Sequence, residues 1–205
     1  MRIPTLYADI ESLIPMKPLP GNHLFIGPIL WSAKVSLPDW WETLPTDKPI
    51  VFITLGSSGD SELLPMIIDT LSKMPVTVIC VTAKKKLVSK AYSNVFIAEF
   101  LPGKEAVKKA DVIICNGGSP MVYQSLVENK SVIGIPGNLD QYLMMSLLTA
   151  ANKGQLIRAG KADAETVHNA VNKALSERGK TQNPASNAPS FSIKKIEELI
   201  QLSTK

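Results

Sequence analysis

The chain has 205 residues, of which 45% are hydrophobic and 20% charged, as in ordinary globular proteins large enough to bury one sizeable core. Its net charge is only +4, and no aromatic residues interleave with the densest basic cluster, residues 84–86, so nucleic-acid binding is not expected. No apolar run approaches the ~20 residues needed to cross a bilayer, and the first 20 residues lack the apolar segment of a signal peptide, so no transmembrane segment is expected.

Residues 1–48 form a proline-rich arm without sustained hydrophobic periodicity. Prolines at this density argue against a sheet or long helices in this part of the chain. Trp31, Trp40 and Trp41 make the arm too apolar for a disordered tail. We therefore expect the arm to pack its tryptophans on a neighbouring surface.

From residue 49 onward, short apolar runs rich in Val and Ile recur along the chain. They are residues 50–55, 76–81, 94–100, 111–116 and 131–136, with residues 155–160 as a candidate sixth strand. The runs are continuous rather than alternating, which is typical of parallel strands buried on both faces.

Helical segments separate these runs, at residues 61–74, 103–110, 120–130, 139–153 and 162–179. Strands that alternate with helices in this way predict an α/β fold, a Rossmann-like, doubly wound parallel sheet, over residues 49–180. Residues 181–190 are a polar linker and residues 191–202 a predicted closing helix, so we assign residues 181–205 to a linker and C-terminal helix.

Two glycine-rich turns follow predicted strands and lead into predicted helices. GSSGD follows Leu55, and GGSP follows Asn116. In parallel sheets ligands bind at the carboxyl ends of the strands, where free N–H groups of a helix start attract phosphate. Either glycine turn, taken alone, is equally well explained as a tight turn that binds no ligand. Two such turns that end different strands favour an anion site.

Several other classes of site lack their sequence signatures. Neither glycine turn matches the dinucleotide fingerprint or the P-loop. His23 and His168 lack the spacing of a metal pair, and no Ser-His-Asp or Cys-His set is visible, so no metal site is expected. Cys80 and Cys115 fall inside predicted strands, which favours free core thiols and a cytoplasmic location.

The ordered series IVFITLGSSG, NVFIAEFLPG and ADVIICNGGSPMVYQSLVENKSVIGIPGNLDQ resembles the C-terminal, donor-binding half of UDP-glycosyltransferases. The segment GNHLFIGPILW, followed by LPDWW, is similar to the interdomain linker that precedes that half. The resemblance covers nearly the whole chain. It implies the GT-B architecture of two Rossmann-like domains, with the N-terminal, acceptor-binding domain missing here.

The resemblance also implies roles for particular residues. For the donor nucleotide it implies Phe100 against the uracil, the backbone of Leu101 at the base edge, and Gln124 at the ribose. The implied phosphate-binding residues are Ser57, Ser58, Asn116, Gly117, Gly118 and Ser119. Asp140 and Gln141 match the acidic-Gln pair that binds sugar hydroxyls in the family.

Three positions depart from the commoner family pattern. Asn116 replaces the His that usually precedes the glycines in the family, and Gln124 replaces the Glu that usually holds the ribose. Met121 stands near the position at which the family often has a hydroxyl residue that touches phosphate. Asn and Gln still donate and accept hydrogen bonds, whereas Met does not. We therefore expect weak nucleotide binding, and a nucleotide other than UDP stays open.

These observations predict a glycosyltransferase that moves a hexosyl group from a UDP-sugar, or a related NDP-sugar, to an acceptor hydroxyl. The nucleotide-sugar is a substrate, so no cofactor is expected, and the catalytic base is expected in the missing half. This chain alone should therefore be inactive, and it is a candidate for self-association through surface left uncovered. Two alternatives remain: a nucleotide-sugar epimerase of the same fold, or a non-catalytic binding subunit completed by a partner chain.

Overall fold

A computed structural model describes residues 4–14, 18–85 and 91–178 of the chain. They fall into two compact units, the first ending at Leu30 and the second beginning at Trp31. The described part of the expected nucleotide-binding domain, residues 49–85 and 91–178, lies entirely in the second unit. The expected linker and closing helix at residues 181–205 lie outside the described residues.

The first unit contains a short parallel sheet, which the sequence prediction had argued against. Strands β1 (Thr5–Tyr7) and β2 (His23–Phe25) pair in parallel, and η1 (Glu11–Leu13) lies between them in the chain. The prediction was wrong because each strand has three residues and the prolines fall outside both. The Tyr7 hydroxyl lies 2.9 Å from His23 Nδ1, which links the two strands through their side chains.

The second unit is built on a sheet of six parallel strands in the order β5-β4-β3-β6-β7-β8. The strands are β3 (Ile50–Thr54), β4 (Thr77–Val81), β5 (Val95–Ala98), β6 (Val112–Cys115), β7 (Ser131–Gly134) and β8 (Gly154–Leu156). Every neighbouring pair is parallel, which confirms the predicted doubly wound fold, including the candidate sixth strand. Except for β4, which ends with its run at Val81, each strand ends before its apolar run does, so residues such as Leu55 and Asn116 pass into the loops at the carboxyl edge.

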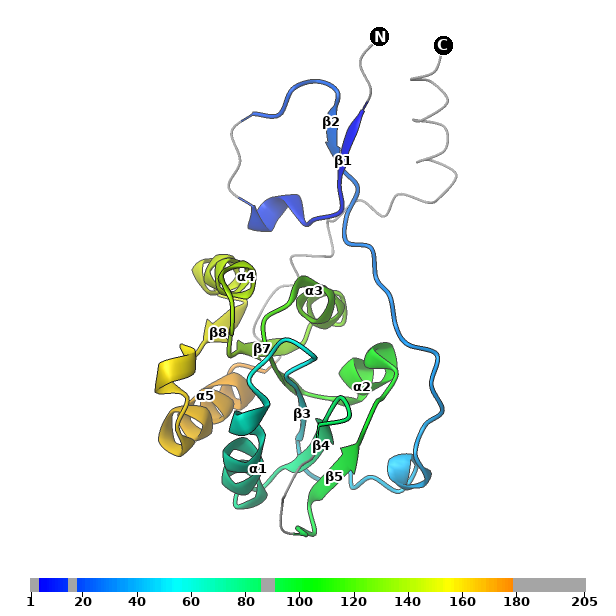
Figure 1. The fold of residues 1–205 in the computed structure, drawn as a ribbon, viewed down its shortest axis with the longest axis vertical. Helices are drawn as coiled ribbons and strands as arrows, with labels where there is room; N and C mark the ends of the chain where they lie inside the picture. The colour runs from blue at the N-terminus through cyan, green and yellow to red at the C-terminus, as the bar shows by residue number, and fades with distance from the viewer. Residues whose placement is uncertain (1–3, 15–17, 86–90, 179–205) are drawn as a thin grey trace. The chain divides into compact units, whose positions relative to one another are not determined.

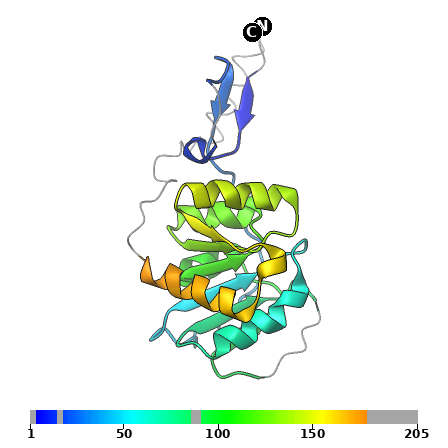
Figure 2. The same ribbon diagram turned by 90° about the vertical axis from the view of Figure 1, so that its left-hand side faces the viewer.

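Helices cover both faces of this sheet (Figures 1 and 2). They are α1 (Leu64–Ser72), α2 (Gly103–Lys109), α3 (Ser119–Val127), α4 (Leu139–Ala150) and α5 (Ala164–Ser176), with short helices η2 (Asp39–Trp41), η3 (Ser61–Leu63) and η4 (Ala159–Lys161). Helices α1 and α5 share one core with the sheet, and α2, α3 and α4 lie on the opposite face. Among the described residues, no helix is both long and apolar enough to cross a membrane.

The tryptophans of the arm have different surroundings. Trp41 is buried, and its ring centroid lies 4.8 Å from Lys109 Nζ. Trp40 packs on Phe96, with ring centroids 5.5 Å apart. Packing on a surface is therefore confirmed for these two, whereas Trp31 is 74% exposed.

The strand order creates a topological switch point between β3 and β6. The chain runs from β3 outward to β4 and β5, then returns to β6 and continues to β7 and β8 on the other side. At such a point the connections after the two central strands leave in opposite directions and open a crevice where ligands bind. Both predicted glycine turns follow these two strands.

Candidate functional site

The turn after β6 contains two adjacent glycines with different structural constraints. Gly117 has φ +80°, and a Cβ there would lie 2.5 Å from Met145 Cγ. Gly118 has φ −65°, and the atom nearest to a Cβ there would be Asn116 Oδ1, at 3.4 Å. Glycine at 117 is therefore required by the backbone and its packing, whereas residue 118 has room for a small side chain.

Helix α3 begins directly at this turn. Its N-cap is Gly118, which provides no side-chain hydrogen bond to the first turn. By contrast, Asn138 caps α4 and Asp163 caps α5 with their side chains. The first-turn N–H groups of α3 lack an intrahelical partner, and the positive end of the helix dipole adds to their attraction for an anion.

A hydrogen-bond network joins this turn to the loop after β3. Asn116 Nδ2 donates to Ser58 Oγ at 3.1 Å, and the Gly118 N–H donates to Asn116 Oδ1 at 3.2 Å. The Gly117 N–H donates to Cys115 Sγ at 3.3 Å. The loops of the two central strands are thus held together by side-chain contacts across the switch point.

Gln141, in the first turn of α4, extends this network to the loop after β7. Its Nε2 donates to Ser58 Oγ at 2.9 Å, and its Oε1 accepts from the Gly137 N–H at 2.8 Å. The residue is only 3% exposed. Its neighbour Asp140 is exposed at the same helix start. Of the predicted sugar-binding pair, only Asp140 is therefore open to solvent as it stands.

The predicted base site follows β5. Phe100 is 44% exposed, whereas Leu101 is buried. Lys84 Nζ lies 5.7 Å from the centroid of the Phe100 ring, which brings a cation to this aromatic face. An exposed aromatic ring at the carboxyl edge of a sheet offers a flat surface on which a base can stack.

Gln124, on α3, lies close to the segment that carries Phe100. It is 7% exposed, and its Nε2 donates to the carbonyl oxygen of Trp31. A Cβ placed on Gly103 would lie 2.8 Å from Gln124 Oε1. Within the described chain, this Oε1 is a buried side-chain oxygen without a hydrogen-bond partner. Such an acceptor is costly to leave unsatisfied, and a ligand hydroxyl could supply the missing donor.

The remaining predicted phosphate residues lie at the two glycine turns. Ser57 is exposed after β3, and Ser119 is half-buried in the first turn of α3. The network connects Ser58, Asn116, Gly118 and Gln141, whereas Phe100 and Gln124 lie near residues 101–103. The predicted residues thus form a phosphate-side group and a base-side group.

Sequence reasoning missed two lysines of this region. Residues 84–86 were identified only as the densest basic cluster, yet Lys84 lies over Phe100, and Lys85 Nζ donates to the Gly59 carbonyl oxygen at 3.2 Å. Their position directly after β4, at the carboxyl edge of the sheet, was a usable indication. Both add positive charge near the predicted nucleotide site.

The thiols are held away from solvent. Burial raises the pKa of Cys80 and of Cys115 to about 12. Both cysteines are free, as predicted from their place in strands. Neither is suited to nucleophilic chemistry near neutral pH, because the thiolate is the reactive form.

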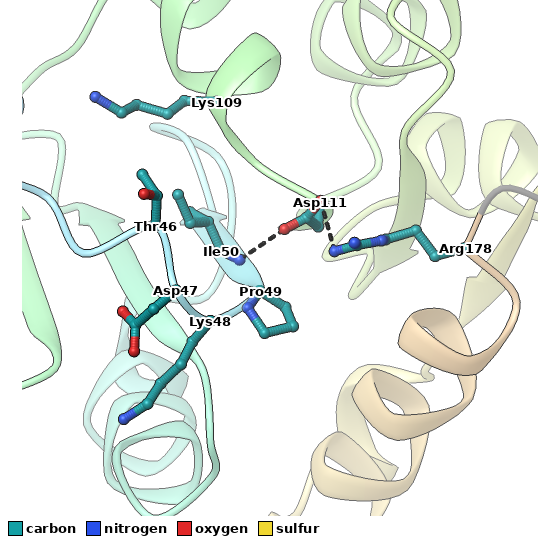
Figure 3. A pocket seen from close by; sticks show the side chains of 8 residues that line it. All are labelled: Thr46, Asp47, Lys48, Pro49, Ile50, Lys109, Asp111 and Arg178. Atoms are coloured by element: carbon teal, nitrogen blue, oxygen red, sulfur yellow. Dashed lines mark hydrogen bonds and ion pairs between the residues drawn. The ribbon is translucent and has the colours of Figure 1, made fainter.

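A cavity of about 320 Å³ lies at the opposite edge of the sheet, where β3 and β6 begin (Figure 3). Asp111 lines it between Ile50 and Arg178, accepting from the Ile50 N–H at 2.8 Å and contacting Arg178 Nη1 at 2.9 Å. Lys109 also lines it and donates to the Trp41 carbonyl oxygen at 2.8 Å. Because these charged groups have protein partners, the cavity is better explained as part of the strand junction than as a ligand site.

Across residues 4–14, 18–85 and 91–178, no group of three or more His, Cys, Asp or Glu side chains could hold a metal ion.

Comparison with known proteins identifies the family. Residues 50–201 match the glycosyltransferase family 28 C-terminal domain. The chain belongs to this family. The predicted resemblance to the donor-binding half of a GT-B glycosyltransferase is thereby confirmed at the level of fold and family.

Relatives with curated names occur in mycobacteria. A PGL/p-HBAD biosynthesis glycosyltransferase of Mycobacterium tuberculosis (strain ATCC 25177 / H37Ra) is 45% identical over 172 residues, 84% of this chain and 40% of that protein. A PGL/p-HBAD biosynthesis rhamnosyltransferase of Mycobacterium bovis (strain BCG / Pasteur 1173P2) is 42% identical over 187 residues, 91% of this chain and 42% of that protein. The chain therefore spans about two fifths of the length of these relatives.

Among solved structures, the calicheamicin glycosyltransferase CalG4 superimposes with a TM-score of 0.81 at 13% identity. The alignment covers 100% of this chain and 55% of CalG4. At this identity the likeness supports the fold alone, and it agrees with the parallel sheet and two helix layers described above.

Proposed function

We propose that this chain binds the nucleoside diphosphate sugar of a glycosyltransferase that moves a hexosyl group to an acceptor hydroxyl. The observation that carries the proposal is the start of α3 at the switch point, where the glycine N-cap provides no side-chain hydrogen bond to the first-turn N–H groups. A departing diphosphate needs donors in fixed positions, and backbone N–H groups at a helix start need no reorganisation when charge develops.

Within this proposal, the base-side group binds the nucleoside. Phe100 stacks on the base, the backbone of Leu101 meets its edge, and Gln124 Oε1 accepts a hydrogen bond from a ribose hydroxyl. Support comes from the exposure of Phe100 and from the unsatisfied oxygen of Gln124. UDP fits this description, and thymidine diphosphate is the informative comparison because it lacks the 2′-hydroxyl and adds a methyl group to the base.

The diphosphate then lies at the phosphate-side group, whose residues at the two glycine turns are Ser57, Ser58, Asn116, Gly117, Gly118 and Ser119. The sugar lies toward the start of α4, where Asp140 is exposed and Gln141 supports the adjoining loop. The name of the 42% identical relative favours a rhamnosyl group as the sugar, and the names of both relatives favour acceptors of the PGL/p-HBAD class. These names also favour transfer over the epimerase alternative.

The base that activates the acceptor belongs, in this proposal, to an N-terminal, acceptor-binding half that this chain does not include. The chain alone then binds donor without transferring sugar. Two unpaired cysteines are consistent with a cytoplasmic location, which forms part of the proposal.

Calorimetry with UDP, thymidine diphosphate and uridine tests the nucleotide site. We expect both diphosphates to bind in the micromolar to millimolar range and uridine to bind more weakly. Phe100→Ala should lower the affinity for UDP by a factor of about ten, since stacking on an aromatic ring contributes roughly 1–3 kcal/mol per base. Ile97→Ala removes another exposed apolar side chain, from β5, and should leave UDP binding unchanged. Absence of binding at millimolar diphosphate, with the protein folded, would contradict the proposal.

A further inference from the structure

Ser58 occupies an unusual position among the hydroxyl groups of the site. It lies exposed in the loop after β3, yet its Oγ receives hydrogen bonds from two side-chain amides. Asn116 Nδ2 lies 3.1 Å from this oxygen and Gln141 Nε2 lies 2.9 Å from it. The two amides come from different segments, the turn after β6 and the first turn of α4. Three loops of the carboxyl edge therefore converge on one hydroxyl.

The orientation of both amides is fixed by backbone N–H groups. The Gly118 N–H lies 3.2 Å from Asn116 Oδ1, and the Gly137 N–H lies 2.8 Å from Gln141 Oε1. A backbone N–H donates and never accepts, so the oxygen of each amide must face it. The NH₂ group of each amide consequently faces Ser58, and neither amide can turn over without losing a bond to the backbone.

A serine hydroxyl has two acceptor lone pairs and one hydrogen to donate. With both lone pairs of Ser58 Oγ occupied by amide donors, its hydrogen points away from Asn116 and Gln141. A hydroxyl that accepts two hydrogen bonds is also polarised into a better donor. Since the residue is exposed, this donor is available to a ligand.

We propose that Ser58 is a dedicated hydrogen-bond donor to a diphosphate oxygen, and that Asn116 and Gln141 are positioning residues that act through it. This inference rests on the proposed function, and it differs from the direct contacts that the family resemblance implies for Asn116 and Gln141. Lys85, bound to the Gly59 carbonyl oxygen of the same loop, adds positive charge beside the donor. An anionic oxygen is therefore the acceptor that this loop favours.

A double-mutant cycle with UDP as the probe tests the inference. Gln141→Glu keeps an oxygen for the Gly137 N–H but places a second carboxylate oxygen against Ser58, which then donates its hydrogen to the carboxylate rather than to UDP. Ser58→Ala removes the donor itself. UDP carries no sugar, so a direct contact between Gln141 and the sugar would not affect these measurements.

We expect Ser58→Ala to weaken UDP binding about tenfold, as for a lost hydrogen bond to a charged group. Gln141→Glu should weaken it by at least as much in the parent protein. In the Ser58→Ala background, the factor by which Gln141→Glu lowers the affinity for UDP should be about ten times smaller, because only the charge repulsion between Glu and UDP remains. Ser58→Thr, which keeps the hydroxyl, should restore binding to within about threefold of the parent. Ser93→Ala, in the loop before β5, is the matched serine control and should have no effect.

Equal losses from Gln141→Glu in both backgrounds would overturn the inference, as would unchanged binding by Ser58→Ala. If the parent protein binds UDP normally, neither of these two results contradicts the proposed function. Failure of the folded parent to bind either UDP or thymidine diphosphate would instead contradict the proposed function, and the inference with it.

Discussion

The two adjacent glycines after β6 should respond in opposite ways to substitution by alanine. Gly117→Ala places an L-residue at φ +80°, which costs roughly 1–2 kcal/mol. The new Cβ would also lie 2.5 Å from Met145 Cγ and 3.2 Å from the Gln141 carbonyl oxygen, and overpacking of this kind costs about 1–3 kcal/mol. The free energy of unfolding should therefore fall by about 2–5 kcal/mol.

Gly118→Ala should leave the fold intact. Its φ of −65° suits alanine, and the nearest atom to the new Cβ is Asn116 Oδ1 at 3.4 Å. The change should alter the free energy of unfolding by less than about 1 kcal/mol, because alanine reduces the entropy of the unfolded chain but is less favourable than glycine as an N-cap. If phosphate approaches Gly118 closely, however, the methyl group should weaken UDP binding about tenfold, the equivalent of one charge-assisted hydrogen bond.

Urea unfolding and calorimetry on the two variants separate these effects. The account requires a large stability loss in Gly117→Ala alone and a binding loss in a Gly118→Ala protein of nearly unchanged stability. Equal destabilisation by both substitutions would refute the packing argument. Parent-like UDP binding by Gly118→Ala would show that the second glycine serves the turn alone.

Three further predictions concern the stability of the fold and its polar groups. Asp111→Ala should lower the free energy of unfolding by about 1–3 kcal/mol, since it removes the acceptor of the Ile50 N–H. Arg178→Ala should lower it by less than about 1 kcal/mol, because that side chain is 54% exposed. Equal losses for the two variants in urea unfolding would show instead that the ion pair dominates. Burial raises the pKa of Cys80 and Cys115 to about 12, above the ordinary 9.0. The contribution of these thiols to the free energy of unfolding is therefore fully present below pH 9. It is lost as the pH rises from 9.0 toward about 12, by about 1.4 kcal/mol per pH unit for each thiol. The free energy of unfolding, measured from pH 8 to pH 11, should therefore fall less steeply with pH in Cys80→Ala than in the parent protein. Identical slopes for the two proteins would contradict this. Gln124→Met should change the free energy of unfolding by less than about 1 kcal/mol, since the lost bond to Trp31 is offset by removal of an unsatisfied oxygen. The same variant should bind UDP more weakly. An unchanged affinity for UDP in calorimetry would exclude a ribose contact.

The sheet could be predicted because burial on both faces leaves a direct trace in the sequence. Runs such as residues 111–116 are continuous in Val and Ile, and the structure places strands in each of them. The pair β1 and β2 left no such trace, because three-residue strands between prolines carry too few side chains to show a period.

The sequence predicts a location for the candidate site but not the contacts among its residues. The glycine turns after Leu55 and Asn116 identified the carboxyl edge of β3 and β6. The shared contacts of Asn116 and Gln141 with Ser58 join positions 58 and 83 residues apart in the chain. No local spacing encodes such a contact, since it depends on how three loops meet. The position of Lys84 over Phe100 depends likewise on neighbouring strands, β4 and β5.

The most direct test of the central claim is to map UDP on the folded chain by the backbone amide chemical shifts of ¹⁵N-labelled protein. The account predicts that the largest shifts occur at Gly117, Gly118 and Ser119, with smaller ones at Leu101, and that they saturate with a single affinity. Shifts centred instead on residues 46–50, beside the cavity at the amino ends of the strands, would contradict it. So would the absence of any shift at millimolar UDP and thymidine diphosphate.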